Sequence, residues 1–361
     1  MKILGIETSC DETSVAIVDE NRQILANIVR SQLKEHDEYA GVVPEIAARA
    51  HLDFLSLMVP EALAQAGLDY KDLDGIAVTS GPGLIGGVLV GVMAAKSIAL
   101  AHNLPILGIN HLEGHLLTPR LIDADLEFPY LVVLVSGGHS QILIAHGLGN
   151  YERLATTVDD AVGEAFDKSA KLMGLGYPGG PKIEKMALEA TGKYEFDLPR
   201  PVLKNHKLNL SFSGLKTAVR REAEKYIIDG KIEAEFVSDL SNALQEAIGD
   251  VLNNRLKKAL KIYLDQTNPE NPVCVLCGGV AANKVLRARL EATCQKNGTK
   301  FVAPPLSLCG DQAAMIAWAG LERFKAGYSD DLDFVSRPRW PLDKEAEPVL
   351  GEKGSKSGVK A

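Results

Sequence analysis

The chain has 361 residues, 46% of them hydrophobic and 24% charged, which suits a globular protein with two domains of ordinary size. The formal net charge of −8 excludes a surface coated with cations for binding nucleic acid, but it does not exclude a local basic groove. Five cysteines without a repeated spacing exclude a disulfide framework and favour a reducing compartment, so we expect a cytoplasmic protein.

The first half opens with a strand, a polar turn and an alternating strand. The turn is Glu7-Thr-Ser-Cys-Asp-Glu-Thr13, between strand-like residues 2–6 and 14–19. The uncharged stretch 76–95 is long enough to cross a membrane, but the segment Ser80-Gly-Pro-Gly83 interrupts it, so we expect a strand, a glycine loop and a helix instead of a membrane span. The periodicity further predicts a helix over 43–66, a strand over 75–79 and a helix that ends near 101.

Two histidines four residues apart follow the next apolar run, Pro105-Ile-Leu-Gly-Ile109. In His111-Leu-Glu-Gly-His115, a helix is predicted to begin with Asn110 as its cap and Glu113 as the capping partner. Residues four apart on a helix lie one above the other, so both imidazoles can reach one ion. Taken alone, the pair is interpreted equally well as a metal site or as two hydrogen-bonded histidines.

The second half repeats the layout of the first. Strand-like residues 130–135 and 140–145 flank the turn Ser136-Gly-Gly-His139, which indicates a duplicated α/β unit. Cys274 and Cys277 face opposite sides of a predicted strand, which favours a core role over a zinc or redox pair. The remaining predictions are helices over 160–173, 214–228, 234–264, 281–296 and 312–325, a strand over 273–277, a loop over 174–181 and a disordered tail over 345–361.

These elements divide the chain into two lobes. Residues 1–129 are expected to form the N-terminal lobe, which carries the histidine pair, and residues 130–311 the C-terminal lobe. The last helix, about 312–325, is expected to pack back on the N-terminal lobe. An irregular excursion is expected at 190–213 in the C-terminal lobe.

Three glycine-rich turns follow apolar strands. They are Ser80-Gly-Pro-Gly83, Ser136-Gly-Gly-His139 and Gly278-Gly279. Glycine lets the backbone approach phosphates closely, and amides at the start of a following helix favour anions. Three such turns in a duplicated α/β chain favour nucleotide binding, although the sequence has no G-x-x-x-x-G-K-[ST] motif and is therefore not a P-loop protein.

Two carboxylates have a functional and an ordinary interpretation. Asp11 is either a solvated turn residue or, in a nucleotide site, a group that holds a cation or accepts a proton. Cys10 beside it has no basic neighbour in the sequence that would activate its thiol. Asp311 precedes the last helix, where it is either a helix cap or the third ligand of a metal site with His111 and His115.

Basic residues form four local groups, and most such groups are only solvated faces. The first group lies in the irregular excursion with Phe212, where a contact with a phosphate backbone is best placed. The groups are Arg200, Lys204, His206 and Lys207; Lys216, Arg220 and Arg221; Arg255, Lys257 and Lys258; and Arg337 with Arg339.

Seven motifs, in order, resemble the bacterial tRNA adenosine threonylcarbamoyltransferase family (TsaD), once described as a glycoprotein endopeptidase. The resemblance covers about residues 1–342. The motifs are Glu7-Thr-Ser-Cys-Asp-Glu-Thr13, His111-Leu-Glu-Gly-His115, Val135-Ser-Gly-Gly-His139, Gly163-Glu-Ala-Phe-Asp-Lys168, Tyr177-Pro-Gly-Gly-Pro181, Phe212-Ser-Gly-Leu-Lys216 and Gly278-Gly-Val-Ala-Ala-Asn283.

The resemblance implies an α/β fold of two related lobes, the duplicated actin, Hsp70 and sugar-kinase (ribonuclease H-like) fold, with the active site between the lobes. It implies transfer of a threonylcarbamoyl group from threonylcarbamoyl-adenylate to the exocyclic amine of an adenosine. That adenosine lies beside the anticodon in tRNAs that read codons beginning with A.

The resemblance also implies roles for individual residues. Asp11 resembles the catalytic carboxylate, placed to help deprotonate the attacking amine. His111, His115 and Asp311 resemble the ligands of one divalent metal ion, iron or alternatively zinc. The residues that resemble contacts to the bound nucleotide, threonylcarbamoyl-adenylate or ATP, are Leu134, Val135, Ser136, Gly137, Gly138, Asp167, Gly180 and Asn283.

The implied partners are tRNA, an inactive paralogue of the same fold (TsaB type) and a small P-loop ATPase (TsaE type), with no membrane. One departure is visible, because Gly310 and Gln312 flank Asp311 where related sequences often have threonine and asparagine. Two rival functions stay open. A zinc endopeptidase would need a glutamate at Leu112, and an ATPase or small-molecule kinase of the same fold would give the histidine pair no role.

Overall fold

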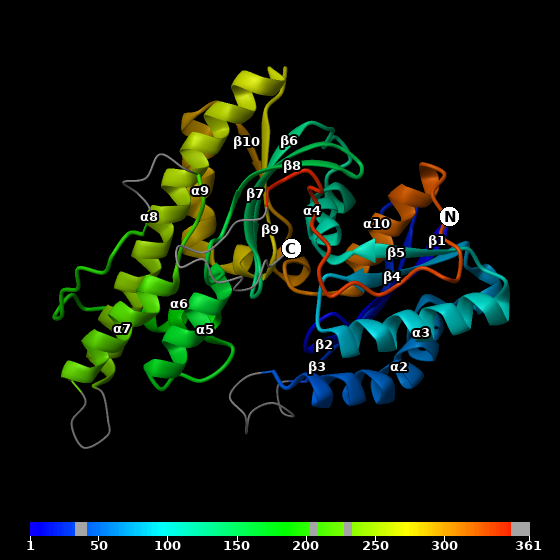
Figure 1. Cartoon of the computed structure of the whole chain (residues 1–361), viewed down its shortest axis with the longest axis horizontal. Coiled ribbons are helices and arrows are strands. Elements are labelled where there is room, and N and C mark those ends of the chain that lie inside the picture. The colour runs from blue at the N-terminus through cyan, green and yellow to red at the C-terminus, as the bar shows by residue number, and fades with distance from the viewer. Residues whose placement is uncertain (33–41, 202–207, 227–232, 348–361) are drawn as a thin grey trace.

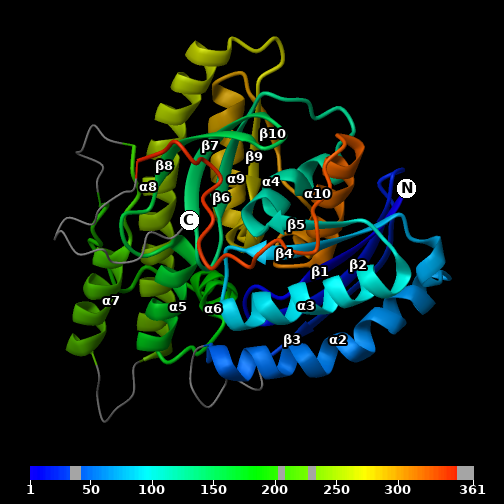
Figure 2. The same ribbon diagram turned by 45° about the vertical axis from the view of Figure 1, so that its right-hand side comes forward.

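The computed structural model describes residues 1–32, 42–201, 208–226 and 233–347. Within these ranges the chain forms two five-stranded sheets with helices between and around them (Figures 1 and 2). Lys204, His206 and Lys207, the last residues of the helix predicted at 214–228, and the predicted tail from 348 onward lie outside the described residues.

The first sheet has the strand order β3-β2-β1-β4-β5. Strands β1, β2 and β3 form an antiparallel meander, and β4 and β5 continue the sheet in the direction of β1. The bounds are Lys2–Glu7 for β1, Glu12–Asp19 for β2, Ile24–Ser31 for β3, Gly75–Gly81 for β4 and Ile106–Asn110 for β5.

The second sheet repeats this arrangement in the order β10-β9-β6-β7-β8. An antiparallel meander of β6, β7 and β8 is again extended by two parallel strands beside the first of them. The bounds are Tyr130–Val135 for β6, Ser140–Gly147 for β7, Asn150–Thr156 for β8, Val273–Cys277 for β9 and Lys300–Val302 for β10. The predicted duplication of an α/β unit is therefore confirmed. We propose that the lobes divide between residues 129 and 130.

The helices form three layers around the two sheets. Helices α2 (Pro44–Ala66) and α3 (Ile85–His102) cover the outer face of the first sheet. Helices α4 (His111–Ile122) and α10 (Ala313–Lys325) pack between the sheets. On the outer side of the second sheet, α8 (Ala234–Thr267) and α9 (Lys284–Lys296) pack against its strands. Helices α5 (Val162–Leu172), α6 (Gly179–Ala187) and α7 (Ser213–Lys225) complete the same core. Short 3-10 turns occupy Tyr70–Asp72, Gly279–Ala282 and Leu306–Leu308.

The central position of α10 follows from its sequence. Every residue from Ala313 to Leu321 is buried, and a helix that is apolar on all sides must be enclosed by other elements. It packs against β1, β2, β4 and α4. A Cβ on Gly114 of α4 would lie 2.8 Å from Ile316 Cδ1, so glycine lets the two inner helices pack this closely without displacing that side chain.

The residues after α10 connect the two sheets. This segment, residues 330–343, is here called the C-terminal strap. The N–H of Arg337 donates to the carbonyl of Ser80 at 2.7 Å, and Asn110 Nδ2 donates to the carbonyl of Trp340 at 2.9 Å. Its last residue, Asp343, accepts from the N–H of Arg153 on β8 at 2.8 Å. Figure 1 shows the strap in red, running from the first sheet to the second.

Two predicted boundaries are wrong. The loop predicted at 174–181 ends early, because Asp167 accepts from the N–H of Gly179 and starts α6 there. The helix predicted at 281–296 begins only at Lys284, because Asn283 caps it. Cys274 and Cys277 do face opposite sides of β9, one toward the outer core and one toward the inner core.

The stretch 76–95 divides between β4 and α3, as predicted. In the described part of the chain, α3 alone is long and apolar enough to cross a membrane, and here it packs against β4 and α2.

Candidate metal centre and active site

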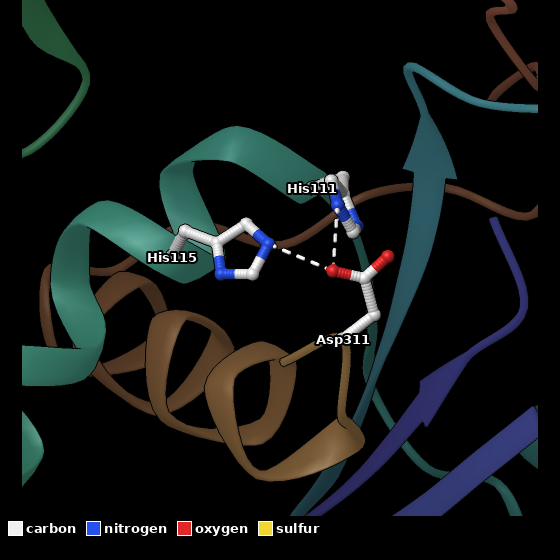
Figure 3. Close-up of side chains that lie close together, drawn as sticks. All are labelled: His111, His115 and Asp311. Atoms are coloured by element: carbon white, nitrogen blue, oxygen red, sulfur yellow. Dashed lines mark hydrogen bonds and ion pairs between the residues drawn. The ribbon is translucent and has the colours of Figure 1, made fainter. Parts of the chain in front are cut away.

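Helix α4 carries two histidines in its first turns. The side chain of Asn110 accepts from the N–H of Leu112 at 2.9 Å, so the cap predicted at Asn110 is confirmed and the helix begins at His111. His111 and His115 are both buried, and their ring centroids lie 4.8 Å apart (Figure 3).

Asp311 reaches the same place from the far end of the sequence. The N–H of Ala313 donates to Ser14 Oγ on β2 at 2.8 Å, which anchors the start of α10. Asp311 Oδ1 lies 2.9 Å from His115 Nε2 and 3.6 Å from His111 Nε2 (Figure 3). The capping position of α10 is Gln312, so Asp311 is not the helix cap.

These three side chains fit a divalent metal ion. One ligand atom from each lies within 4.8 Å of the others. Two imidazole nitrogens and one carboxylate oxygen suit iron, zinc or manganese and leave coordination positions open. Burial would raise the pKa of Asp311, but His111 and His115 hold it well below its ordinary value. Burial would lower the pKa of His111, but the charges of Glu7 and Asp311 raise it to about 9.

Glu113 does not cap α4, contrary to the prediction. Its buried carboxylate accepts from Arg323 Nε and Nη2 on α10 at 2.7 and 2.8 Å, and from the Tyr151 hydroxyl on β8 at 2.6 Å. A buried carboxylate needs a cation or several donors, and a single N–H at the helix start does not supply them. The group joins α4, α10 and the second sheet.

The turn that carries Asp11 is held from both halves of the chain. His51 Nε2 on α2 donates to the carbonyl of Cys10 at 3.0 Å, and the Tyr177 hydroxyl, from the second half, donates to Asp11 Oδ2 at 3.2 Å. Burial and the charge of Asp11 raise the pKa of Cys10 well above its ordinary value, which argues against a nucleophilic thiolate. Burial and the charge of Asp11 likewise raise the pKa of Glu12.

The segment Leu134 to Gly138 ends β6 and enters the second glycine turn. Leu134 and Val135 are buried in the sheet. The carbonyl of Ser136 accepts from the N–H of Gly163, so helix α5 starts against this turn. A Cβ on Gly137 or Gly138 would meet nothing within 4 Å, and neither residue has a positive φ. The protein itself therefore imposes no need for glycine at these two positions, whereas a closely bound ligand would.

The other predicted nucleotide contacts lie in the second half. Asp167 Oδ1 accepts from the N–H of Gly179 at 2.7 Å, and burial raises the pKa of Asp167. A Cβ on Gly180 would meet nothing within 4 Å. Both polar atoms of the Asn283 side chain already have partners within the protein. Its Oδ1 accepts from the N–H of Leu286, and its Nδ2 donates to Gln245 Oε1, both at 2.9 Å.

Two arginines of the basic groups already have partners within the chain. Arg255 is fully buried and donates to the carbonyl of Asn209 at 3.2 Å. Arg200 pairs with Asp250 at 2.9 Å. Phe212 is fully buried in the core, so it cannot stack on a base.

Several residues near these side chains were given no role from the sequence. Glu7 and Thr79 end neighbouring parallel strands, next to the strand that leads into His111. The carboxyl ends of parallel strands gather at one edge of a sheet, and this rule could have grouped Glu7 with the histidines. Tyr177 and His51 carry no such signal, because their contacts depend on how the halves and layers pack.

Comparison with known proteins agrees with the motifs. The family model described as "tRNA N6-adenosine threonylcarbamoyltransferase" (TsaD) matches residues 23–318. Curated relatives of that name from Brucella anthropi and Brucella suis are each 52% identical over 366 residues and cover 100% of both chains. A solved structure of full-length HypF is 13% identical with a TM-score of 0.54, over 90% of this chain and 46% of that one, and shows a shared fold. The chain belongs to the tRNA N6-adenosine threonylcarbamoyltransferase family.

Proposed function

We propose that this protein transfers a threonylcarbamoyl group from threonylcarbamoyl-adenylate to the exocyclic amine of the adenosine beside the anticodon in tRNAs reading codons that begin with A. The observation that carries the proposal is the convergence of His111, His115 and Asp311, in a chain of this family, at the carboxyl ends of the parallel strands. Asp11 follows β1 of the same sheet and supplies the proposed catalytic carboxylate.

The metal ion is proposed to be iron, with zinc as the alternative. His111, His115 and Asp311 would hold it, and their chemistry suits either ion. When bound, such an ion supplies a Lewis acid that polarises the carbonyl oxygens of the acyl donor.

The nucleotide end of the donor is proposed to lie on the second half, against Leu134 to Gly138, Asp167, Gly180 and Asn283. Support comes from the open glycines of this turn and from the start of α5, whose backbone N–H groups favour anionic phosphate. Asp167 would bind ribose hydroxyls. Because the side chain of Asn283 already has partners, it would contact the adenosine mainly by shape.

Asp11 is proposed to accept the proton of the attacking amine. Its carboxylate is 3% exposed, and Tyr177 orients one of its oxygens. The phenol can only donate there, because burial and the charge of Asp11 raise the pKa of Tyr177 well above its ordinary value. Burial and the charge of Asp11 raise the pKa of Glu12 beside it, which favours the neutral form of Glu12.

The proposed macromolecular partners are tRNA, an inactive paralogue of the same fold and a small P-loop ATPase, all in the cytoplasm. An apolar face on α2 and α3 supports the paralogue. This partner face consists of the exposed side chains of Leu52, Leu57, Ile85, Leu89, Met93 and Leu100. Exposed apolar residues on adjacent helices are typical of an interaction site.

A peptidase lacks support from this geometry. The position after the first histidine is Leu112, which is fully buried in the inner core and supplies no base for a water molecule.

The proposal is tested with purified protein, its partners, tRNA and synthetic threonylcarbamoyl-adenylate. Mass spectrometry of digested tRNA should show threonylcarbamoyladenosine, and the product should disappear with Asp11→Ala and with His111→Ala. Full activity in both variants would overturn the mechanism. Metal-dependent cleavage of casein by the pure protein, without any tRNA product, would overturn the function.

A further inference from the structure

Glu7 is a carboxylate without any exposure to solvent. It ends β1, and Thr79 lies near the end of the neighbouring strand β4. Burying a carboxylate is costly unless several donors surround it. Glu7 accepts from Thr79 Oγ1 at 2.5 Å, from the N–H of Ser9 at 2.6 Å and from His111 Nδ1 at 3.0 Å.

These contacts determine which nitrogen of His111 faces Glu7 and which faces Asp311. Glu7 Oε2 lies 3.0 Å from His111 Nδ1, and a carboxylate oxygen accepts a hydrogen bond from an imidazole N–H. Nδ1 therefore carries hydrogen toward Glu7. Nε2 is left facing Asp311 Oδ1, at 3.6 Å.

A second acceptor competes for the same nitrogen. Ser9 Oγ lies 3.1 Å from His111 Nδ1, nearly the same distance as Glu7 Oε2. The carboxylate is the stronger acceptor, because a charge-assisted hydrogen bond is about twice as strong as a neutral one. Ser9 thus provides a matched control.

We propose that Glu7 is the positioning residue of the metal centre: by accepting the Nδ1–H of His111, it orients the ring and directs Nε2 at the ion. A carboxylate behind a metal-bound imidazole also makes the ligand nitrogen more basic. This inference rests on the proposed metal site at His111, His115 and Asp311. It assigns a function to the first residue of the turn motif, which the proposed reaction does not otherwise use.

The test measures metal affinity in chelator competition with cobalt(II) or zinc(II) added to the metal-free protein. Glu7→Gln keeps the shape of the side chain but removes its charge, and its affinity should fall about 10- to 100-fold. Ser9→Ala should stay within about threefold of the wild type, since a neutral hydrogen bond contributes little net free energy. If Ser9→Ala loses affinity and Glu7→Gln does not, the assignment is overturned.

A second variant covers the case in which Glu7→Gln does not fold. Thr79→Val removes the hydroxyl that donates to Glu7 Oε2 and leaves the carboxylate and the histidine unchanged. The metal affinity of this variant should fall about threefold or more. Asp239→Asn is the folding control, because that buried carboxylate accepts from backbone N–H groups at Thr191, Gly192 and Tyr194. It should lower stability and leave metal affinity unchanged. If Thr79→Val binds metal like the wild type, Glu7 does not position the ligand.

A spectroscopic readout is independent of activity. With ¹⁵N-labelled histidine and bound zinc, His111 should show a proton on Nδ1 that exchanges slowly with water, and this signal should shift or vanish in Glu7→Gln. These experiments distinguish a wrong metal site from a wrong role for Glu7. If metal binding survives His111→Ala and Asp311→Ala, the proposed metal site is wrong. If binding requires both residues but Glu7→Gln changes neither affinity nor the Nδ1 signal, only the role of Glu7 is wrong.

Discussion

At the scale of single residues, the neighbouring carboxyls of Asp11 and Glu12 impose a cost on the folded state. Burial and the charge of Asp11 raise the pKa of Glu12 well above its ordinary 4.5. The folded protein then binds more protons than the unfolded chain does once the pH exceeds about 4.5, so stability falls as the pH rises toward the folded-state pKa of Glu12. Such a conflict is typical of a functional site rather than of a structural one.

Glu12→Gln should therefore stabilise the protein at neutral pH. An amide occupies the same volume without the buried charge, so the free energy of unfolding should exceed that of the wild type above about pH 4.5, and the gap should widen with pH. Urea unfolding from pH 4 to 8 measures this difference. Parallel curves for the two proteins across that range would show that Glu12 does not carry the raised pKa.

At the scale of elements, the two inner helices set the geometry of the proposed metal centre. His111 and His115 lie on α4, Asp311 precedes α10, and Glu113 ties these helices together through Arg323. A shift of one helix relative to the other would separate the histidines from the carboxylate. The buried ion pair thus connects packing with metal binding.

Arg323→Met should cost about 3–5 kcal/mol of unfolding free energy, because it leaves Glu113 buried without its cation. Adding Glu113→Leu should recover most of that loss, since a well-packed apolar pair replaces a buried ion pair at little cost. Urea unfolding of both single variants and of the double variant gives the coupling energy. If Arg323→Met lowers the free energy of unfolding by less than about 1 kcal/mol, the Glu113–Arg323 pair contributes no more than a solvent-exposed ion pair.

Sequence reasoning located these elements but did not pair their side chains. The strands of the two hairpins and the helices at 43–66 and 312–325 were predictable because their hydrophobic periodicity is strong. Glu113 was assigned to a cap because Asn110 lies three residues before it, whereas its partners Tyr151 and Arg323 are distant in sequence. Local spacing carries no information on such long-range pairs, and tertiary contacts decided the outcome.

At the scale of the whole molecule, helix α2 links the proposed active site with the proposed partner face. Helix α2 contributes exposed Leu52 and Leu57 to the partner face, and it also carries His51, which bonds the carbonyl of Cys10 beside Asp11. The hydroxyl of Tyr177, from the second half of the chain, donates to Asp11 in the same turn. The sequence indicated a duplicated fold, but not that α2 and the second half both contact the turn that carries Asp11.

Leu89→Asp combined with Met93→Asp should prevent the paralogue from binding. Both side chains are about half exposed, so the fold should tolerate aspartate, while two buried charges at an interface should weaken the complex by at least about thirtyfold. Thermal unfolding of the free chain and sedimentation of the mixture measure the two effects. Leu188→Asp, on an exposed leucine away from α2 and α3, is the control. An intact complex in the double variant would place the partner elsewhere.

The most direct measurement of the central claim is the single-turnover rate of threonylcarbamoyl transfer to tRNA by Asp11→Asn, with metal content matched to the wild type. Asparagine keeps the hydrogen bond from Tyr177 but cannot accept a proton from the attacking amine. The rate should fall about 10²- to 10⁴-fold, with binding of the donor unchanged. A rate within about threefold of the wild type would contradict the account, because general-base catalysis at Asp11 would then contribute almost nothing.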